Sequence, residues 1–438
     1  MRIAYIAAGA AGMYCGSCLH DNTLAAALMA QGHDVALIPT YTPLRTDEVD
    51  VTNEPIFYGA INVFLQQKAG LFRRSPALLD RLLDRPGLLR WISRFAASTD
   101  ARDLGALTLS ILQAEQGYQH KELHRLLEFL GEFQPDVVQL TNAMFLGIGA
   151  AIRRQLGVPV VSGLTGEDLF LQELPEAYRS SVQTEMARSA RDVDAFTATS
   201  QYYKEVMQGF LDVDEKRLHV VPLGIKLQGF EPHQRRPGSE DTITIGYLAR
   251  ICPEKGLHIL LEAFRLLRQA SNGERVRLAI AGYLSARDRA YFEEQRQALQ
   301  DWGVADAVEL LGEIDRPQKL EFFHRIDLLS VPTIYQEPKG LFVLEAWAAG
   351  VPVVQPSHGA FPELIETHGG GLVCQPGSAE DLAFAIQSLI DDPDRRLELG
   401  RLGRAAVEEH FNEEAMAERT AAVYEEILQQ PRLAGVST

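Results

Sequence analysis

The sequence predicts an α/β fold with two doubly wound parallel-sheet domains, and three observations support it. Short β-branched or apolar runs alternate with longer helical patterns, which is typical of parallel α/β sheets. This alternation restarts after a stretch rich in proline, glycine and charge at residues 226–241. The chain also has 438 residues, more than one hydrophobic core usually serves. We therefore expect a first domain over 1–228, a second over 229–412 and a C-terminal helical segment over 413–438.

The first domain is expected to contain six strands with helices between them. One helix is expected over Asp21–Gln31, because Gly32 follows it as a stop signal. A long helical insertion is expected at roughly 66–132. The strand candidates are RIAYIA (2–7), DVALIP (34–39), DVVQL (136–140), PVVSG (159–163), AFTATS (195–200) and LHVVPLG (218–224).

The second domain repeats the pattern, with helices expected over 256–270, 285–302, near 318–324 and from Gly340. The strand candidates are TITIGYL (242–248), VRLAIAG (276–282), VELLG (308–312), LLSVP (328–332), PVVQP (352–356) and GLVCQ (371–375). The last helix, Glu413–Gln430, carries apolar residues at helical spacing, and we expect it to cross back onto the first domain. A ligand of such domains lies at the carboxyl ends of the strands, so the cleft between the two domains is the expected binding region.

Composition restricts the class of protein. A formal net charge of −17 argues against a nucleic-acid partner, because binding a phosphate backbone needs a basic face. No apolar run reaches the roughly 18–20 residues that a membrane-spanning helix needs. Four cysteines do not make a secreted disulfide framework. We therefore expect a cytoplasmic protein.

Two segments of the second domain carry the main candidate site. In GYLARICPEKG, Arg250 and Lys255 lie in a loop between a strand and a helix start, which suits a diphosphate. In EPKGLFVLEAWAAGVPVV, Glu337 lies in a loop and Glu345 lies in the second turn of the next helix. Carboxylates at these places can accept hydrogen bonds from sugar and ribose hydroxyls. Alternatively, these charges belong to a solvated loop and to a helix N-terminus that favours acids.

The combined motifs resemble family-4 retaining glycosyltransferases of the GT-B fold, the glycogen synthase-like superfamily also called glycosyltransferase group 1. The likeness extends to the glycine-rich turn 9–16, QGHDV, TATSQYY and VVPLGI. It implies that Arg250 and Lys255 bind the donor diphosphate, that Glu337 contacts the donor sugar and that Glu345 binds the ribose. The backbone N–H groups of Gly340 and Leu341, and Gly12 and Gly16 in the first turn, complete the implied donor site.

This resemblance implies transfer of a sugar from a nucleoside-diphosphate sugar to a hydroxyl acceptor with retention of anomeric configuration. The acceptor class is left open among carbohydrates, lipid-linked sugars and small molecules. No metal or other cofactor is implied, since two cations and a helix start can stabilise the leaving diphosphate. The alternatives are a non-catalytic nucleotide-sugar-binding subunit, or a phosphorylase or epimerase on the same fold.

The first domain departs from the family pattern at the positions where a histidine is usual. Thr165 occupies one such position, within LTGED, and Asn142 lies near another. Glu167 and Asp168 follow closely, and could orient an acceptor hydroxyl or the donor sugar. They could equally be acids that favour the N-terminus of a helix.

Two further features are open to two interpretations each. Cys15 and Cys18, in CGSC, could form a redox or half-zinc site, but small residues lining a tight loop is the favoured interpretation. Residues 64–95 hold seven basic residues against two acidic ones, a net charge of +5, with leucines and a tryptophan between them. That stretch could contact an anionic membrane peripherally, although an amphipathic lid over the acceptor site is favoured.

Overall fold

The computed structural model describes residues 1–9, 16–53, 56–59, 62–63, 66–67, 101–231 and 242–430. The chain forms two compact units. The first unit combines Met1–Pro222 with Glu413–Thr438, and the second unit comprises Leu223–Asn412. The chain therefore returns to the first unit at its C-terminal end, as the sequence predicted for the last helix.

The first unit is built on a six-stranded parallel sheet with the order β2-β1-β3-β4-β5-β6. Its strands are β1 Arg2–Ala8, β2 Asp34–Thr40, β3 Val137–Leu140, β4 Val160–Leu164, β5 Ala195–Ala198 and β6 Leu218–Val220. Its α-helices are α1 Gly16–Ala30, α5 Ala101–Leu112, α6 His120–Phe133, α7 Leu146–Leu156, α8 Glu167–Glu173, α9 Glu176–Ala190, α10 Gln201–Leu211 and α18 Glu413–Gln429.

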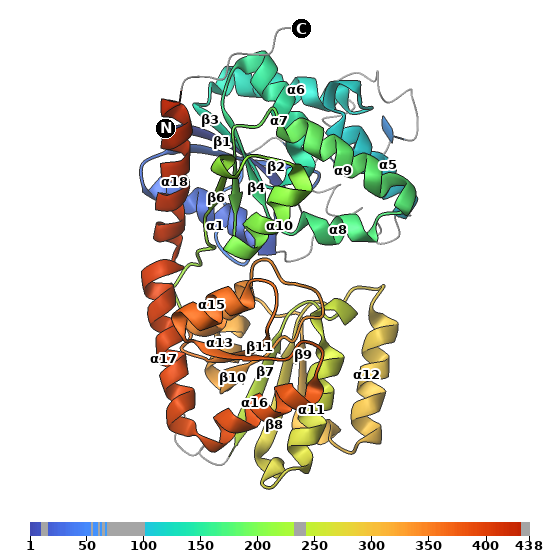
Figure 1. The fold of residues 1–438 in the computed structure, drawn as a ribbon, viewed down its shortest axis with the longest axis vertical. Coiled ribbons are helices and arrows are strands. Elements are labelled where there is room, and N and C mark those ends of the chain that lie inside the picture. The colour runs from blue at the N-terminus through green and yellow to red at the C-terminus, as the bar shows by residue number, and fades with distance from the viewer. Residues whose placement is uncertain are drawn as a thin grey trace. The chain divides into compact units, whose positions relative to one another are not determined.

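Both faces of the first sheet are buried, and β1 shows why. Alternate residues of a strand point to opposite faces. Ile3, Tyr5 and Ala7 join one hydrophobic core together with α1 and α18, whereas Ala4 and Ile6 join a second core together with α6, α7, α9 and α10. A strand buried on both faces needs an almost continuous apolar run, which RIAYIAA supplies. Figure 1 shows the sheet between these two groups of helices.

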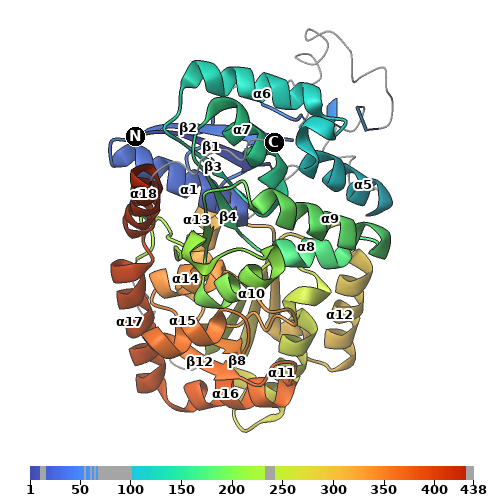
Figure 2. The ribbon, with the colours of Figure 1, turned by 45° about the horizontal axis from the view of Figure 1, so that its top comes forward.

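Helix α18 packs beside α1, and both views of the ribbon show the two helices next to each other (Figures 1 and 2). Met416, Tyr424 and Ile427 of α18 enter the core on that face of the sheet. The Tyr424 hydroxyl also donates to Oε1 of Gln139 on β3, at 3.0 Å. The apolar spacing that predicted this helix therefore forms its buried stripe.

The second unit contains another six-stranded parallel sheet, with the order β12-β11-β10-β7-β8-β9, and one large hydrophobic core. Its strands are β7 Ile243–Leu248, β8 Val276–Ala281, β9 Val308–Gly312, β10 Leu328–Leu329, β11 Val353–Pro356 and β12 Gly371–Cys374. Its α-helices are α11 Leu257–Gln269, α12 Arg289–Asp301, α13 Arg316–Arg325, α14 Leu341–Ala348, α15 Phe361–His368, α16 Ala379–Asp391 and α17 Pro393–His410.

Some predicted boundaries differ from the observed ones. The first helix begins at Gly16 instead of Asp21. The strand expected over 328–332 covers only Leu328–Leu329, and the residues after it form the loop that carries Glu337. The first unit ends at Pro222, before the expected boundary at 228, because Leu223, Ile225 and Phe230 pack in the core of the second unit.

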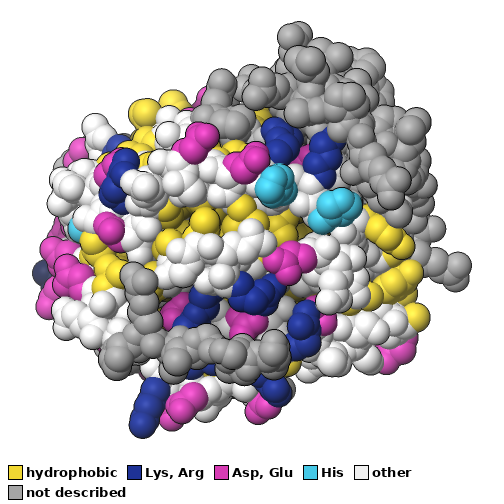
Figure 3. Space-filling view, turned by 90° about the horizontal axis from the view of Figure 1, so that it is seen from above, with side chains coloured by type: hydrophobic (Ala, Val, Ile, Leu, Met, Phe, Trp, Pro, Cys, Tyr) yellow, Lys and Arg dark blue, Asp and Glu magenta, His cyan; other side chains and the backbone are white. Residues whose placement is uncertain are grey.

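The surface can be described only in part. Gln66 and Gln67 apart, the basic stretch 64–95 lies outside the described residues, so the expected membrane contact is untested. None of the described helices is long and apolar enough to cross a membrane. On the face drawn in Figure 3, basic and acidic side chains are interspersed with apolar ones.

We predict that Tyr424→Phe lowers the free energy of unfolding of the first unit by about 1–3 kcal/mol, because it leaves the buried Oε1 of Gln139 without its donor. Urea unfolding followed by circular dichroism measures the change. Tyr178→Phe is the matched control, since that hydroxyl has no hydrogen-bond partner among the described residues. Equal stability of the two variants would contradict the prediction.

Candidate functional site

The candidate site lies at the carboxyl edge of the second sheet, where the loops after β7, β10 and β11 meet. The N–H of Ile334 donates to the carbonyl of Glu254 at 3.0 Å, which joins the first two loops. The N–H of Ala360 donates to the carbonyl of Glu337 at 2.8 Å, which joins the second and third. Backbone hydrogen bonds between loops fix the side chains that these loops carry.

Lys255 and Glu337 form a buried ion pair across these loops. The ammonium Nζ of Lys255 lies 2.7 Å from Oε2 of Glu337. The same ammonium donates to the Tyr335 hydroxyl at 2.5 Å, and that hydroxyl donates in turn to Oε2 of Glu337. The rings of Tyr335 and Phe342 lie beneath the ammonium, with centroids at 4.9 and 5.4 Å. Two residues 82 positions apart in the sequence are therefore held as one unit.

The pair keeps Glu337 charged although only 5% of the residue is exposed. Burial is the largest single influence on this carboxyl group and raises its pKa, but the charge of Lys255 opposes it. The hydrogen bonds from Lys255 and Tyr335, and the nearby Lys339, also lower the pKa of Glu337, which ends below its ordinary value. Burial, followed by the charge of Glu337, raises the pKa of Tyr335 well above its ordinary value, so this phenol remains a donor.

Gly256 explains why the loop after β7 places Lys255 where it does. Its φ of +69° lies in the left-handed region, which side chains disfavour. A Cβ at this position would lie 1.8 Å from the carbonyl oxygen of Pro332 in the loop after β10. Glycine therefore permits the close approach of the two loops that brings Lys255 to Glu337.

Arg250, on the same loop, is exposed, and no carboxylate among the described residues forms an ion pair with it. The Cys252 side chain is a hydrogen-bond partner of its guanidinium, and the charges of Glu254 and Asp288 act on it, whereas the ammonium of Lys255 is paired with a carboxylate. Two cations of one loop thus differ in their partners. A guanidinium can bind a phosphate through two parallel hydrogen bonds.

Helix α14 begins beside this loop pair. Gly340 precedes it with φ +68°, and Leu341 is its first residue. The first N–H groups of a helix have no partner within the helix and carry partial positive charge. Glu345, in the second turn, is buried and accepts from Nζ of Lys319 on α13 at 2.6 Å. The two predicted glutamates are therefore each paired with a lysine.

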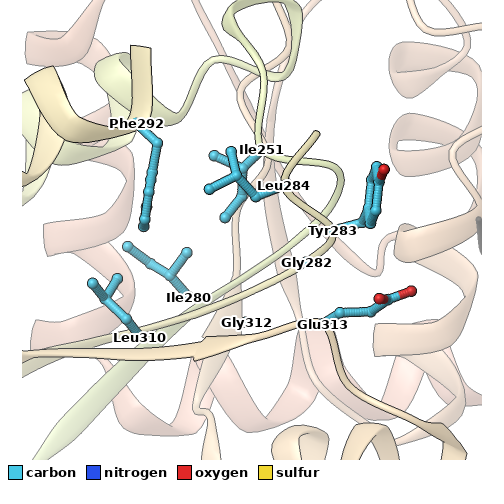
Figure 4. A pocket seen from close by; sticks show the side chains of 9 residues that line it. All are labelled: Ile251, Ile280, Gly282, Tyr283, Leu284, Phe292, Leu310, Gly312 and Glu313. Carbon is cyan, nitrogen blue, oxygen red and sulfur yellow. The ribbon is translucent and has the colours of Figure 1, made fainter. Parts of the chain in front are cut away.

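A pocket of about 260 Å³ lies at the same edge, beyond the ends of β7, β8 and β9. Figure 4 shows Ile251, Ile280, Leu284, Phe292 and Leu310 on one side, with Tyr283 and Glu313 on the other. Ile251, which lines the pocket, comes directly after Arg250. The full lining is Ile251, Ile280, Gly282, Tyr283, Leu284, Phe292, Leu310, Gly312 and Glu313.

The acceptor-side candidates of the first unit lie together at the carboxyl edge of its sheet. Glu167 is buried, and its Oε1 accepts from the N–H of Ala143 at 2.9 Å. Its Oε2 accepts from the N–H groups of Thr165 and Gly166, at 2.8 and 3.0 Å. Both oxygens of Glu167 are thus used by the backbone, which favours its interpretation as a helix N-terminal acid.

Asp168 and Asn142 have local partners as well. The Tyr203 hydroxyl lies 2.9 Å from both Oδ1 of Asp168 and Oε2 of Glu167. Asn142 caps a 3₁₀ turn, since its side-chain oxygen accepts from the N–H of Met144 at 3.1 Å. Thr165 contributes its backbone N–H to Glu167. The hydrogen bonds of these residues therefore stabilise the local structure at the edge of the sheet.

The glycine turn is only partly described. Gly16 begins α1 and is exposed, whereas Gly12 and Cys15 lie outside the described residues. Cys18 is buried, and its thiol contacts the carbonyl of Ala8 at 3.4 Å. No group of metal-ligating side chains occurs among the described residues, and the proposed role of the CGSC pair stays untested.

Sequence reasoning missed three residues of the second-unit site: Tyr335, Lys339 and Lys319. The first two flank Glu337 within two positions and could have been found as polar neighbours of a candidate acid. Nothing in the sequence singled out Lys319, since a lysine on a helix is usually solvated. The structure shows that it is buried against Glu345.

The chain is thus an α/β protein of two units, each built on a six-stranded parallel sheet. The family model "Glycosyl transferases group 1" matches residues 230–406, and "Glycosyl transferase 4-like domain" matches residues 22–224. The chain therefore belongs to the group 1 glycosyltransferases, as the sequence motifs indicated.

Individual relatives agree with this assignment. Glycogen synthase of Mycobacterium tuberculosis is 27% identical over 294 residues, covering 67% of this chain and 69% of the relative. A GDP-mannose-dependent phosphatidylinositol monomannoside mannosyltransferase of Corynebacterium glutamicum is 26% identical over 312 residues, covering 68% and 78%. The structure of Anabaena HepE in complex with UDP has a TM-score of 0.67 at 17% identity, covering 97% of this chain and 100% of HepE, which shows the shared GT-B fold.

We predict that Glu337 contributes stability at neutral pH that is lost on acidification. Its pKa is lowered in the folded state, so its contribution is complete above the ordinary value of 4.5 and disappears as the pH falls through the lower folded pKa. Urea unfolding of wild type and Glu337→Gln between about pH 6 and pH 3 should show a stability difference that shrinks with acid. The exposed Glu366→Gln serves as control, and a pH-independent difference for Glu337→Gln would refute the pairing.

Proposed function

We propose that this chain is a retaining, metal-independent glycosyltransferase that moves a sugar from a nucleoside-diphosphate sugar to a hydroxyl acceptor. The observation that carries the proposal is the arrangement at the edge of the second sheet. The apolar pocket beside Ile251, the side chains of Arg250 and Lys255, the start of α14 and the carboxylate of Glu337 lie next to one another at this edge. A nucleotide sugar has matching parts in the same order: a base, a diphosphate and a sugar.

In this arrangement the base enters the pocket next to Ile251 and stacks on apolar side chains. The diphosphate then reaches Arg250, one residue away, and Lys255 beyond it. Lys255 has three N–H donors, of which Tyr335 and Glu337 take two, so one remains for a phosphate oxygen. The carboxylate of Glu345 accepts hydrogen bonds from the ribose hydroxyls, and Oε1 of Glu337 accepts from the donor sugar.

The reaction breaks the bond between C1 of the sugar and the phosphate oxygen, and forms a bond between C1 and the acceptor oxygen. The nucleoside diphosphate leaves with the bonding electron pair. Arg250, Lys255 and the N–H groups at the start of α14 stabilise its developing charge, which is the task that a metal performs in other transferases. Retention requires the acceptor to approach the face of the sugar that the diphosphate leaves.

The acceptor is a carbohydrate, a lipid-linked sugar or a small polyol. The names of two relatives, a glycogen synthase and a phosphatidylinositol monomannoside mannosyltransferase, support this range of acceptor classes. We expect the reaction in the cytoplasm, with peripheral contact to the inner membrane face if residues 64–95 bind anionic lipid. Co-sedimentation with phosphatidylglycerol vesicles tests this last expectation.

Incubation with ADP-, GDP- and UDP-sugars, with glucose, maltose or myo-inositol as acceptor, tests the activity. We expect release of nucleoside diphosphate that EDTA does not reduce, and an α-linked product from an α-linked donor by NMR. Binding without turnover on any acceptor would favour a non-catalytic subunit. Cleavage of a glycoside that depends on inorganic phosphate would favour a phosphorylase, and a changed sugar on an intact nucleotide an epimerase.

We predict that Arg250→Gln raises the dissociation constant of the best nucleoside diphosphate by about 10- to 100-fold, since a charged hydrogen bond contributes about 1.5–3 kcal/mol. Isothermal titration calorimetry measures the constant. Arg401→Gln, an exposed arginine of the same unit, should bind like wild type. Unchanged affinity in Arg250→Gln would remove this residue from the donor site.

A further inference from the structure

A buried ion pair joins helices α13 and α14 of the second unit. Nζ of Lys319 on α13 donates to Oε1 of Glu345 on α14 at 2.6 Å. Lys319 is 8% exposed and Glu345 is 7% exposed. Both residues belong to the second unit, as do the loop that carries Lys255 and the pocket beside Ile251.

Lys319 lies where a lysine is electrostatically disfavoured. Helix α13 follows the N-cap Asp315, whose side chain accepts from the N–H of Gln318 in a capping box. Lys319 comes directly after Gln318, in the first turns of the helix, where the partial positive charge of the helix repels a cation. Burial of the ammonium adds a desolvation cost. Glu345 offsets both costs, but a buried ion pair is often no more stable than apolar side chains of similar volume. Stability therefore does not explain the pair.

The two carboxylate oxygens of Glu345 have different surroundings. Oε1 is engaged by Lys319, whereas Oε2 has no hydrogen-bond partner among the residues that the structure describes. Nor is Oε2 one of the fully buried side-chain atoms of those residues that lack a partner. Solvent therefore reaches Oε2, and a hydroxyl group of a ligand can reach it as well.

The pair adjoins two parts of the proposed donor site. Glu345 comes three residues after Phe342, so the two share one face of α14. The Phe342 ring centroid lies 5.4 Å from the ammonium of Lys255, the candidate diphosphate ligand. On the other side, Lys319 follows Glu313 of the pocket lining by six positions. Short chain segments thus connect the pair to the pocket and to Lys255, as a ribose connects a base to a diphosphate.

We propose that Lys319 is the positioning residue for Glu345 and makes the site selective for ribose over deoxyribose, an inference that rests on the proposed nucleotide-sugar donor. The ammonium holds Oε1 and leaves Oε2 to the ligand. A ribose hydroxyl donates to Oε2, whereas a sugar without that hydroxyl leaves the charged oxygen without a donor. Lys319 acts through Glu345 and does not itself contact the nucleotide.

The binding test uses calorimetry with whichever of ADP, GDP and UDP binds best, and with its 2′-deoxy and 3′-deoxy forms. We expect wild type to bind the ribonucleotide about 10- to 100-fold more tightly than at least one deoxy form, the range for a hydrogen bond to a charged group. Lys319→Met should reduce this ratio to less than about threefold, with nearly unchanged affinity for that deoxy form.

Two control variants accompany Lys319→Met. Lys319→Arg keeps a cation beside Glu345 and should keep most of the ribose preference. Lys216→Met, which replaces an exposed lysine of the first unit, should show the wild-type preference. Circular dichroism checks that each variant is folded.

A double variant separates positioning from a general effect on folding. Lys319→Met alone leaves a buried carboxylate without its cation, whereas Lys319→Met combined with Glu345→Gln removes both charges. If Lys319 acts through Glu345, the double variant and Glu345→Gln alone should have the same reduced ribose preference. A further loss of preference in the double variant would show that Lys319 contacts the nucleotide itself, and would overturn the positioning role.

The two proposals fail in different ways. Absence of nucleoside diphosphate binding in wild type would refute the proposed donor site. Equal affinity of wild type for the ribose and deoxyribose forms, or an unchanged ratio in Lys319→Met, would refute the role of Lys319 alone. A uniform loss of affinity for all three nucleotides in Lys319→Met would indicate a structural role and would refute it too.

Discussion

The buried ion pair between Lys255 and Glu337 is the interaction on which the organisation of the second-unit site depends. It joins the loop after β7 to the loop after β10, and Gly256 allows the two backbones to approach closely enough for the pair to form. A buried pair gains little net stability, because desolvation of the two charges offsets their attraction. Breaking it is costly, however, since one charge would remain without a partner. The pair therefore fixes loop geometry more than it adds stability.

The two units share an architecture but differ in what lies at the carboxyl edges of their sheets. In the second unit each predicted glutamate is paired with a lysine, and Arg250 forms no ion pair with any carboxylate of the residues that the structure describes. In the first unit the carboxylates of Asp21 and Glu167 are instead satisfied by hydroxyl and backbone donors. The second edge thus suits an anion. The first edge, with neutral donors around its acids, suits hydroxyl groups.

The fold was largely predictable because most strands of the two sheets are buried on both faces, the edge strand β9 being an exception. Such strands appear as unbroken apolar runs, and all twelve strand candidates contain a strand. The errors have physical causes. β10 is short because only Leu328 and Leu329 lie in register with β7, after which the chain must turn to present Glu337. The stretch 226–241 was predicted as linker, yet Phe230 within it is a core residue of the second unit, as are Leu223 and Ile225 just before it.

The candidate site was predictable only where chemistry and spacing coincide. Lys255 and Glu337 were found as motif members, but their direct contact was not, because loop conformation decides which charges meet. Glu167 was a plausible acceptor-side acid until the structure showed its backbone donors. Lys319 left no signal, since a paired buried lysine and a solvated one look alike in sequence.

The ion pair between Lys255 and Glu337 also bears on which residue would attract the diphosphate of the proposed nucleotide-sugar donor. Glu337 neutralises Lys255 at close range, so the ammonium adds little net charge to the site even though it keeps one donor free. The net positive charge must then come from Arg250, the start of α14 and Lys339, whose charge already acts on Glu337. In the proposed donor site, Lys255 would then orient a phosphate oxygen while Arg250 would supply the attraction. The residue that orients the diphosphate would then differ from the residue that attracts it.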